Sequence, residues 1–135
     1  MSKRRLVDTN LVVRYLTQDH PAHAEVAGRL FAACDRGELT LVLLPAVLAE
    51  CVFVLESFYK HSREAINTAL RDLIASPGIE IDDDLLHLDA LDRYARSKLH
   101  FVDCTIAAAA ARTKTPVASF DAGLRKVGDI EVILD

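Results

Sequence analysis

The sequence predicts an α/β fold, in which a mostly parallel sheet of four to five strands is flanked by helices. Short apolar runs of strand length alternate with longer segments in which apolar residues recur at helical spacing. No internal repeat and no low-complexity linker interrupts this alternation, and 135 residues are the size of one domain. We therefore expect a single domain that comprises residues 1–135.

The first half of the chain is expected to contain two strands and four helices. Proline suits the first turn of a helix, where no backbone N–H is needed, so Pro21 and Pro45 mark two helix starts. The side chains of "DTN" (8–10) can cap a helix that follows the first strand. The expected elements are a strand over 4–7, helices from 11 and from 21 to 37, a strand over 40–44, and helices from 45 and over 62–75.

The second half is expected to contain three strands, two helices and a helical turn. Three acids, Asp82, Asp83 and Asp84, precede one of the helices, where acids cap the N-terminus and complement the helix dipole. We therefore assign these acids to capping and not to catalysis. The expected elements are a strand over 79–81, a helix from 85, an alanine-rich helix from 103, strands over 116–120 and 131–134, and a helical turn over 121–127.

The composition is typical of a soluble globular protein, with 51% hydrophobic residues. A proline and a glutamate interrupt the most apolar run, 39–58, so it is not expected to cross a membrane. No apolar signal-peptide segment follows the basic N-terminus, and we expect a cytoplasmic protein. Cys34, Cys51 and Cys104 show no C-x-x-C spacing and are expected to be small buried apolar side chains.

The charge disfavours a protein that holds nucleic acid by its overall charge. The net charge is −4, from 16 basic and 20 acidic residues. Four acids gathered in a metal site would account for this whole imbalance. The remaining surface would then be neutral and could still carry local basic patches.

Four acids lie where a parallel sheet gathers its ligands. Asp8 follows the first predicted strand and Asp121 follows the fourth, and ligands bind beyond the C-terminal ends of parallel strands. Asp103 opens the alanine-rich helix, and Glu50 lies in the second turn after Pro45. Taken singly, Asp8, Asp103 and Asp121 are also explained as ordinary helix caps.

Glu50 is the hardest of the four to explain by structure alone, because it interrupts the most apolar run of the chain. Burying an unpaired charge costs on the order of several kcal/mol, and no Lys or Arg lies three or four residues away. Its partner is either a distant Arg or a divalent cation, which prefers carboxylate oxygens and water. A set of oxygen ligands without His or Cys suits Mg²⁺, with Mn²⁺ as a substitute.

Three segments carry a resemblance to a known family: "LVDTNLVVRYL" (6–16), "PAVLAECVFVL" (45–55) and "HFVDCTIAAAAARTKTPVASFDAGLRK" (100–126). With the order Asp, Glu, Asp, Asp, they resemble the PIN-domain family, and within it the VapC toxins of bacterial and archaeal toxin–antitoxin pairs. The resemblance covers nearly the whole chain. It implies a PIN-like three-layer α/β/α fold and a magnesium-dependent endoribonuclease that cuts tRNA or ribosomal RNA.

The resemblance also assigns the residues of the site. All four acids match the family's catalytic and metal-binding positions, and we expect Asp8 and Asp103 to make the principal metal contacts. Asn10 and Ser119 match polar positions that help to hold the first and last acids or a metal-bound water. Ser119 replaces the more usual Thr of the family, and His100 stands where some relatives carry a further acid.

The implied chemistry is hydrolysis of a phosphodiester bond. One or two divalent ions held by carboxylates acidify the attacking water, neutralise the phosphoryl oxygens and stabilise the leaving oxygen. In-line attack is expected to leave a 5′-phosphate and a 3′-hydroxyl. A metal-free ribonuclease would need His residues as acid and base, and the five histidines show no such pattern; we expect them to be mostly solvated.

RNA has to be held by positive charge near the acids. Arg14, Arg112 and Arg125 are the candidates, with Lys114 and Lys126 beside them, although most such charges are simply solvated. Five Phe, three Tyr and no Trp do not predict a long stacking surface, which favours a short folded RNA. The apolar surplus and the resemblance together imply two partners, a VapB-like antitoxin and a second copy of the chain in a homodimer.

Two alternatives come from other classes of protein. A haloacid-dehalogenase-like phosphatase also places an Asp after its first strand, but it needs a second acid two residues later, where this chain has Asn10. A non-catalytic binding module with a PIN fold is the other alternative. The presence of all four acids speaks against it.

Overall fold

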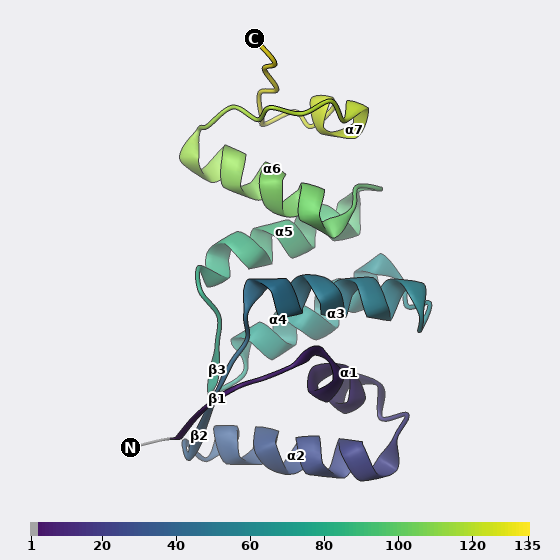
Figure 1. The fold of residues 1–135 in the computed structure, drawn as a ribbon, viewed down its shortest axis with the longest axis vertical. Coiled ribbons are helices and arrows are strands. Elements are labelled where there is room, and N and C mark those ends of the chain that lie inside the picture. Colours follow the sequence, from purple (N-terminus) through teal and green to yellow (C-terminus); the bar gives the residue numbers. More distant parts are fainter. Residues whose placement is uncertain (1–2) are drawn as a thin grey trace. The chain divides into compact units, whose positions relative to one another are not determined.

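The computed structural model describes residues 3–135 and divides into two compact units. The first unit ends at Asp82, and the second runs from Asp83 to Asp135. We describe each unit by itself, and the expectation of a single domain stays a prediction. Figure 1 shows the order of the elements along the chain.

The first unit is built on a parallel sheet. Its described part contains the strands β1 (Lys3–Leu6), β2 (Leu39–Val42) and β3 (Ile79–Glu80) and the helices α1 (Thr9–Thr17), α2 (Pro21–Asp35), α3 (Pro45–Ser57) and α4 (Arg63–Ala75). The strand order is β1-β2-β3, and both pairings are parallel (Figure 1). Each parallel pairing needs a crossover connection, which α1 and α2 supply between β1 and β2, and α3 and α4 between β2 and β3.

Local signals determine where these helices begin. The Asp8 carboxylate caps α1 by accepting a hydrogen bond from the Leu11 amide at 3.0 Å. The Ser62 hydroxyl caps α4 in the same way, from an amide at 3.1 Å. Prolines open α2 and α3, as the sequence predicts. These starts place Asp8 in the short turn between the end of β1 and the start of α1.

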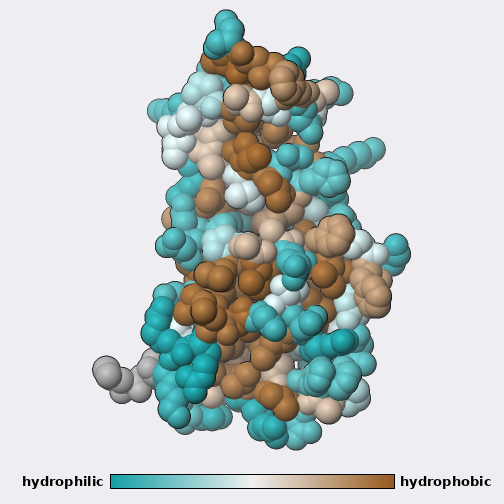
Figure 2. All heavy atoms as spheres, viewed as in Figure 1, coloured by the Kyte–Doolittle hydropathy of each residue, from teal (hydrophilic) through white to brown (hydrophobic). Residues whose placement is uncertain are grey.

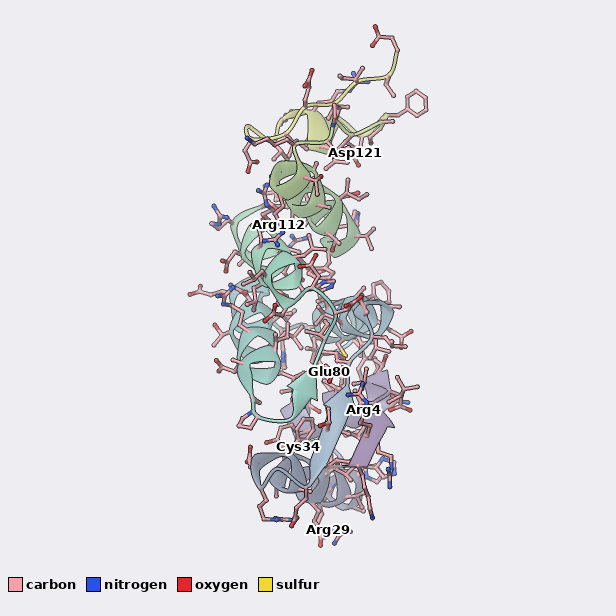
Figure 3. All side chains as sticks on the ribbon, turned by 90° about the vertical axis from the view of Figure 1, so that its left-hand side faces the viewer. Arg4, Arg29, Cys34, Glu80, Arg112 and Asp121 are labelled. Atoms are coloured by element: carbon pink, nitrogen blue, oxygen red, sulfur yellow. The ribbon has the colours of Figure 1, made fainter. Side chains whose placement is uncertain are left out.

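The first unit has a continuous apolar core, and a salt bridge lies on its sheet. Leu41 of β2 and Leu48 and Leu55 of α3 are almost completely buried, because i, i+3, i+4 and i+7 positions face the same side of a helix. On the sheet, Arg4 of β1 and Glu80 of β3 reach across β2 and form two hydrogen bonds of 2.7 and 2.9 Å (Figure 3).

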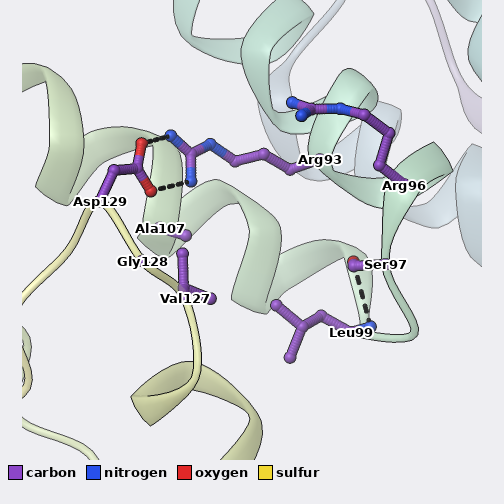
Figure 4. A pocket seen from close by; sticks show the side chains of 8 residues that line it. All are labelled: Arg93, Arg96, Ser97, Leu99, Ala107, Val127, Gly128 and Asp129. Atoms are coloured by element: carbon purple, nitrogen blue, oxygen red, sulfur yellow. Dashed lines mark hydrogen bonds and ion pairs between the residues drawn. The ribbon is translucent and has the colours of Figure 1, made fainter.

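The second unit is helical in its described residues. It contains α5 (Asp84–Arg96), α6 (Phe101–Thr113) and α7 (Ala122–Arg125). Helices α5 and α6 pack against each other, and the rings of Tyr94 and Phe101 meet edge to face with centroids 6.0 Å apart. The Arg93 guanidinium of α5 binds the Asp129 carboxylate through two hydrogen bonds and so holds the loop near the C-terminus (Figure 4).

The α/β fold with a parallel sheet flanked by helices is confirmed, but the prediction of four to five strands is wrong. The sheet of the described residues has three strands. Segments 116–120 and 131–134 pair only through one parallel bridge, which Val117 makes with two backbone hydrogen bonds of 2.8 Å. Two residues after Val117, the Ser119 hydroxyl accepts a local hydrogen bond from the Asp121 amide, and local bonds of this kind compete with strand pairing.

Several smaller expectations have clear outcomes. Asp83 and Asp84 accept hydrogen bonds from amides in the first turn of α5, so their capping role is confirmed. The three cysteines are free and buried, as predicted. The expectation of solvated histidines is wrong for His87, which is only 4% exposed on the packed face of α5. Within residues 3–135, no helix is both long and apolar enough to pass through a membrane.

Candidate functional site

Asp8 lies where β1 turns into α1. The helix begins at Thr9, two residues before the predicted start, so Asp8 is its N-cap. One carboxylate oxygen accepts the 3.0 Å hydrogen bond from Leu11, and the residue is exposed. The bond orients the carboxylate at the C-terminal end of a parallel strand, which is where ligands of such sheets bind. Asn10 is also exposed, in the first turn of the helix that Asp8 caps.

Glu50 is exposed, which corrects the expectation of a carboxylate buried in the most apolar run. The buried face of α3 includes Leu48, Val52 and Leu55. Glu50 is two residues from both Leu48 and Val52, and residues two apart do not face the same side of a helix. It shares its own side with Phe53, three residues later and 66% exposed. Glu50 is therefore an accessible carboxylate on an otherwise apolar helix face.

Asp8 and Glu50 act on the same buried thiol. Burial raises the pKa of Cys51 to about 12, and the charges of Glu50 and Asp8 add to this rise. Asp8 caps α1 and Glu50 lies on α3, and these two helices pack against each other in the first unit. The thiol stays protonated at neutral pH and brings no third negative charge to this pair.

Asp121 is held by backbone and side-chain bonds in the second unit. Its Oδ1 accepts hydrogen bonds from the amides of Gly123 at 2.6 Å and Leu124 at 3.2 Å, which caps α7. Its own amide donates to the Ser119 hydroxyl at 3.0 Å. Ser119 thus holds the backbone of the acid in place, a contact that agrees with the supporting role expected of it.

Asp103 lies in the first turn of α6 and is not a helix cap. The helix begins at Phe101, two residues earlier than predicted, and His100 is its N-cap without a side-chain hydrogen bond. Asp103 and Asp121 line one pocket of about 600 Å³ in the second unit. The other lining residues are Ser97, Lys98, Leu99, His100, Gly123, Lys126 and Val127.

None of the four acids forms an ion pair with a residue that the structure describes. Glu50 and Asp103 accept no hydrogen bond from any residue between 3 and 135, and Asp8 and Asp121 accept only from backbone amides. The alternative of an ion pair between Glu50 and a distant Arg finds no support in this part of the chain. All four carboxylates keep oxygens that can bind a ligand.

The donor set suits a divalent cation. It consists of carboxylate oxygens, with the amide of Asn10 and the hydroxyl of Ser119 beside the first and last acids, and Mg²⁺ prefers oxygen ligands. The described residues contain no single group of three or more His, Cys, Asp or Glu side chains that could hold a metal. The structure places Asp103 and Asp121 in one pocket of the second unit, and it places Asp8 and Glu50 at the start of α1 and on α3, two helices of the first unit that pack against each other. That all four serve one metal centre stays a prediction.

Two of the three arginines predicted to contact RNA are held by acids. Arg14 binds Asp19 at 3.0 Å, and Arg112 lies 3.5 Å from Asp83. Arg125, in the last turn of α7, is exposed and has no ion pair within residues 3–135. Their contact with RNA stays a prediction.

Of the basic residues of the acid pocket, the sequence placed Lys126 beside the candidates for RNA contact but assigned no role to Lys98. Lys98 and His100 lie five and three residues before Asp103, at the entry to α6, and Lys126 follows α7. The spacing of Lys126 from Asp121 was visible in "DAGLRK". Only the turn made by α7 shows that Lys126 lines the pocket and that Arg125, its neighbour, does not.

The comparisons with known proteins agree with the fold. The PIN domain family matches residues 5–130, which is nearly the whole chain. No curated protein matches the sequence. PIN domains are typically metal-dependent nucleases, and an α/β fold with acids after strands and in the first turns of helices agrees with that class. The chain belongs to the PIN domain family.

Proposed function

We propose that the chain is a magnesium-dependent endoribonuclease that hydrolyses RNA phosphodiester bonds. The observation that carries this proposal is the match of the PIN domain family to residues 5–130, together with four carboxylates that have no cationic partner among residues 3–135. Other acids in both units do have such partners, for example Asp19 with Arg14 and Asp129 with Arg93. The family match favours a nuclease over a haloacid-dehalogenase-like phosphatase.

The proposed ligands of Mg²⁺, with Mn²⁺ as a substitute, are Asp8, Glu50, Asp103 and Asp121. Bound divalent ions in nucleases acidify water, neutralise phosphoryl oxygens and stabilise the leaving oxygen. The chain itself orients the oxygens, through the Leu11 amide at Asp8 and the amides of Gly123 and Leu124 at Asp121. In-line attack by water leaves a 5′-phosphate and a 3′-hydroxyl.

We also propose the finer biological role, that of a VapC-type toxin of a toxin–antitoxin pair. Its substrate is then tRNA or ribosomal RNA in the cytoplasm, and its partners are a VapB-like antitoxin and a second copy of the chain. Exposed apolar side chains support a covering partner, because extended apolar surface marks protein contacts. Leu6, Leu44, Phe53 and Phe58 are exposed in the first unit, and Figure 2 shows hydrophobic surface over this part of the molecule.

The test of the nuclease compares variants on total cellular RNA. Wild type is expected to cleave with Mg²⁺ and to stop when a chelator is added, because the acids need a bound cation. Asp8→Asn and Glu50→Gln remove one charge each and are expected to lose most activity. Asp35→Asn is the matched control, since Asp35 is an exposed acid at the end of α2. Sequencing the new 5′ ends identifies the RNA and the bond that is cut.

Two results would contradict the nuclease: equal cleavage by all four proteins, or cleavage that survives the chelator. No cleavage by any form, together with RNA binding, would favour the non-catalytic module.

The toxin role has its own test, because expression is expected to arrest growth and a co-expressed small partner is expected to restore it. Sedimentation of the purified chain measures whether it is a dimer.

A further inference from the structure

The pocket that holds Asp103 and Asp121 also has a basic wall. Lys98, His100 and Lys126 line it together with the two acids. Carboxylates bind a cation, whereas ammonium and imidazole N–H groups donate to an anion such as a phosphate. The second unit thus has donors for a phosphate within the same pocket as two proposed metal ligands.

Lys126 is available to such a ligand. It is exposed, directly after the last residue of α7. It forms no ion pair with any residue between 3 and 135, not even with the two acids that share its pocket. The His100 imidazole likewise makes no hydrogen bond to a described residue. No ion pair to a residue between 3 and 135 therefore competes with an anion at the Lys126 ammonium group.

Phe120 stands next to this pocket in the chain, and it has the largest exposed fraction of the large apolar side chains described, 90%. The backbone on both sides of it is held, by the Ser119 hydroxyl bound to the Asp121 amide and by the cap that Asp121 makes on α7. An exposed ring on a fixed backbone is costly in water and offers a face on which a nucleobase can stack.

From this juxtaposition we propose that the second unit contains a nucleotide subsite for unpaired RNA, in which Lys126 binds a phosphate and Phe120 stacks on the adjoining base. The inference rests on the proposed nuclease function and adds the residues that hold its substrate. The pocket volume of about 600 Å³ falls within the range of small-ligand sites, about 300–1,000 Å³. Phe120 directly precedes Asp121 in the chain, so the proposed subsite combines the exposed ring with the neighbouring pocket that Asp121 lines.

This subsite favours unpaired nucleotides and is tolerant of sequence. A base inside a duplex is stacked on its neighbours and cannot lie on Phe120, whereas a base in a loop can. Stacking reads no hydrogen-bond pattern, since every base has a face. A single ring suffices for a loop of a folded RNA, which agrees with the small number of aromatic residues in the chain.

A second pocket of this unit shows why charge alone does not identify the subsite. It is lined by Arg93 and Arg96, and Figure 4 shows Arg93 pointing at Asp129. Arg93 binds both Asp129 and Asp89, and Arg96 donates to the backbone carbonyl of Asp92. These guanidinium groups already have acceptors, so this pocket is not proposed to bind phosphate.

The test measures binding of a short single-stranded RNA in an Asp8→Asn background, which removes a proposed metal ligand of the first unit. Lys126→Ala is expected to weaken binding about tenfold at low salt and to reduce the slope of log K against log salt by about 0.7, the value for one phosphate contact on a single strand. Lys126→Arg is expected to retain both the affinity and the salt slope of wild type. Lys3→Ala, an exposed lysine of β1, is the matched control.

Phe120→Ala is expected to weaken binding about tenfold without a change in the salt slope, because stacking releases no counterions. Phe120→Tyr keeps the ring and is expected to bind as wild type does. Phe58→Ala removes an exposed ring of the first unit and is the matched control. In otherwise wild-type protein, Lys126→Ala and Phe120→Ala are each expected to raise KM and to leave kcat unchanged. Circular dichroism checks that the variants fold.

The outcomes separate this inference from the nuclease. If wild type cleaves RNA and the Lys126 and Phe120 variants keep their KM and their affinity, the subsite is refuted and the nuclease stands. If wild type cleaves nothing but both variants bind RNA more weakly in the expected pattern, the nuclease is refuted and the subsite stands. Weaker binding by Lys126→Ala with an unchanged salt slope would also refute the phosphate contact.

Discussion

The acid pair of the first unit and the acid pair of the second have different surroundings. Asp8 and Glu50 are exposed, and their charges help to raise the pKa of the buried Cys51 thiol. Asp103 and Asp121 line an open pocket together with Lys126 and other basic groups. Neither pair has a cationic partner among residues 3–135. The two pairs share their chemistry, carboxylates without a cationic partner, but not their neighbours.

This difference indicates that the two acid pairs have different roles in binding. Phe53, on the same side of α3 as Glu50, is an exposed apolar side chain, and neither carboxylate of this pair has a cationic partner among residues 3–135, so the pair is suited to a cation. Around Asp103 and Asp121, carboxylates and ammonium groups occur together, so a cation and a phosphate can both be bound. We therefore expect substitutions in the first pair to change the metal requirement, and those in the second unit to change substrate binding as well.

The largest expected effect comes from removing one acid of each pair. Asp8→Asn and Asp103→Asn are each expected to lower kcat about 10³-fold, the upper part of the range for removing one preorganised electrostatic group. The double variant is expected to lose little more than either single one, because groups that act as a unit are not additive. Rates of cleavage of a defined RNA with Mg²⁺ measure all three.

Additive losses of activity in the double variant would contradict a shared role of the two acid pairs. If the logarithms of the two losses add in the double variant, the pairs act independently, and the proposal of one metal centre with four acids is wrong. The control is Asp35→Asn combined with Asp103→Asn, which is expected to equal Asp103→Asn alone because Asp35 is an exposed acid without an assigned role.

A smaller effect is expected from one methyl group at Gly123. A Cβ there would lie 2.9 Å from Asp121 Oδ1 and 2.7 Å from Leu99 Cδ2, so Gly123→Ala must displace the carboxylate or the leucine. We expect it to raise the Mg²⁺ concentration for half-maximal activity about tenfold, as loss of support for a metal ligand does. Gly128→Ala is the matched control, since its Cβ meets no atom within 4 Å.

An unchanged Mg²⁺ requirement in Gly123→Ala would show that the Leu99 side chain alone gives way and that the position of Asp121 is not critical. Asp121 would then be a binding residue of the pocket, and the other acids would bind the metal. Thermal unfolding of Gly123→Ala and Gly128→Ala separates a local effect from a loss of fold.

The sequence was sufficient for the order of the elements up to α6, but not for the position of Glu50. Proline at a helix start and an acid at a cap are local signals, and both operate as expected at Pro45 and Asp8. A run that is apolar on all sides hides its buried face. Only the packing of Leu48 and Val52 shows that Glu50 is at the surface.

The last part of the chain was the least predictable because side chains there compete with the backbone. "PVASF" has strand composition, yet its pairing ends after one bridge. Local hydrogen bonds follow directly, from the Asp121 amide to the Ser119 hydroxyl and from the Gly123 amide to the Asp121 carboxylate, and such bonds compete with strand pairing. Phe120 lies between Ser119 and Asp121 and is exposed, and Lys126 lines the pocket. A property that arises from three-dimensional turns of this kind has no periodic signal in sequence.

Stability offers a further contrast between the units. Arg93, with a side chain only 14% exposed, binds Asp129 and Asp89, so Arg93→Ala is expected to lower the free energy of unfolding by about 2 kcal/mol, as for bonds to charged groups. Arg29→Ala removes the exposed pair with Glu25 on α2 and is expected to cost about 0.3–0.5 kcal/mol. Urea unfolding followed by circular dichroism measures both. Equal losses would mean that partial burial does not strengthen the Arg93 bonds.

The smallest expected effect concerns Asp19, an acid of the first unit that, unlike Asp8 and Glu50, is fully held. Hydrogen bonds from the Tyr59 and Thr17 hydroxyls, and the Arg14 guanidinium, lower the pKa of Asp19 from 3.8 to about 2. Since the folded-state pKa lies below the unfolded one, the stabilisation is complete above pH 3.8 and is lost as the pH falls toward 2.

Tyr59→Phe removes the strongest of these bonds, and we expect its urea midpoint to be lower than that of wild type near neutral pH. The difference is expected to shrink between pH 3.8 and about 2, where Asp19 becomes protonated in the folded protein. It should shrink again at high pH, because the same bond raises the pKa of Tyr59 above its usual 10. Tyr15→Phe is the control, since the Tyr15 hydroxyl binds no residue between 3 and 135.

A difference that stays constant down to pH 2 would mean that Tyr59 stabilises the unit by packing and not through the ionised Asp19. That result would weaken the contrast on which the site is built. Asp8 and Glu50 have no cationic partner among residues 3–135, whereas Asp19 is held by side-chain hydrogen bonds and an ion pair. If the Asp19 bonds contribute nothing, the lack of such bonds at Asp8 and Glu50 no longer distinguishes function from structure.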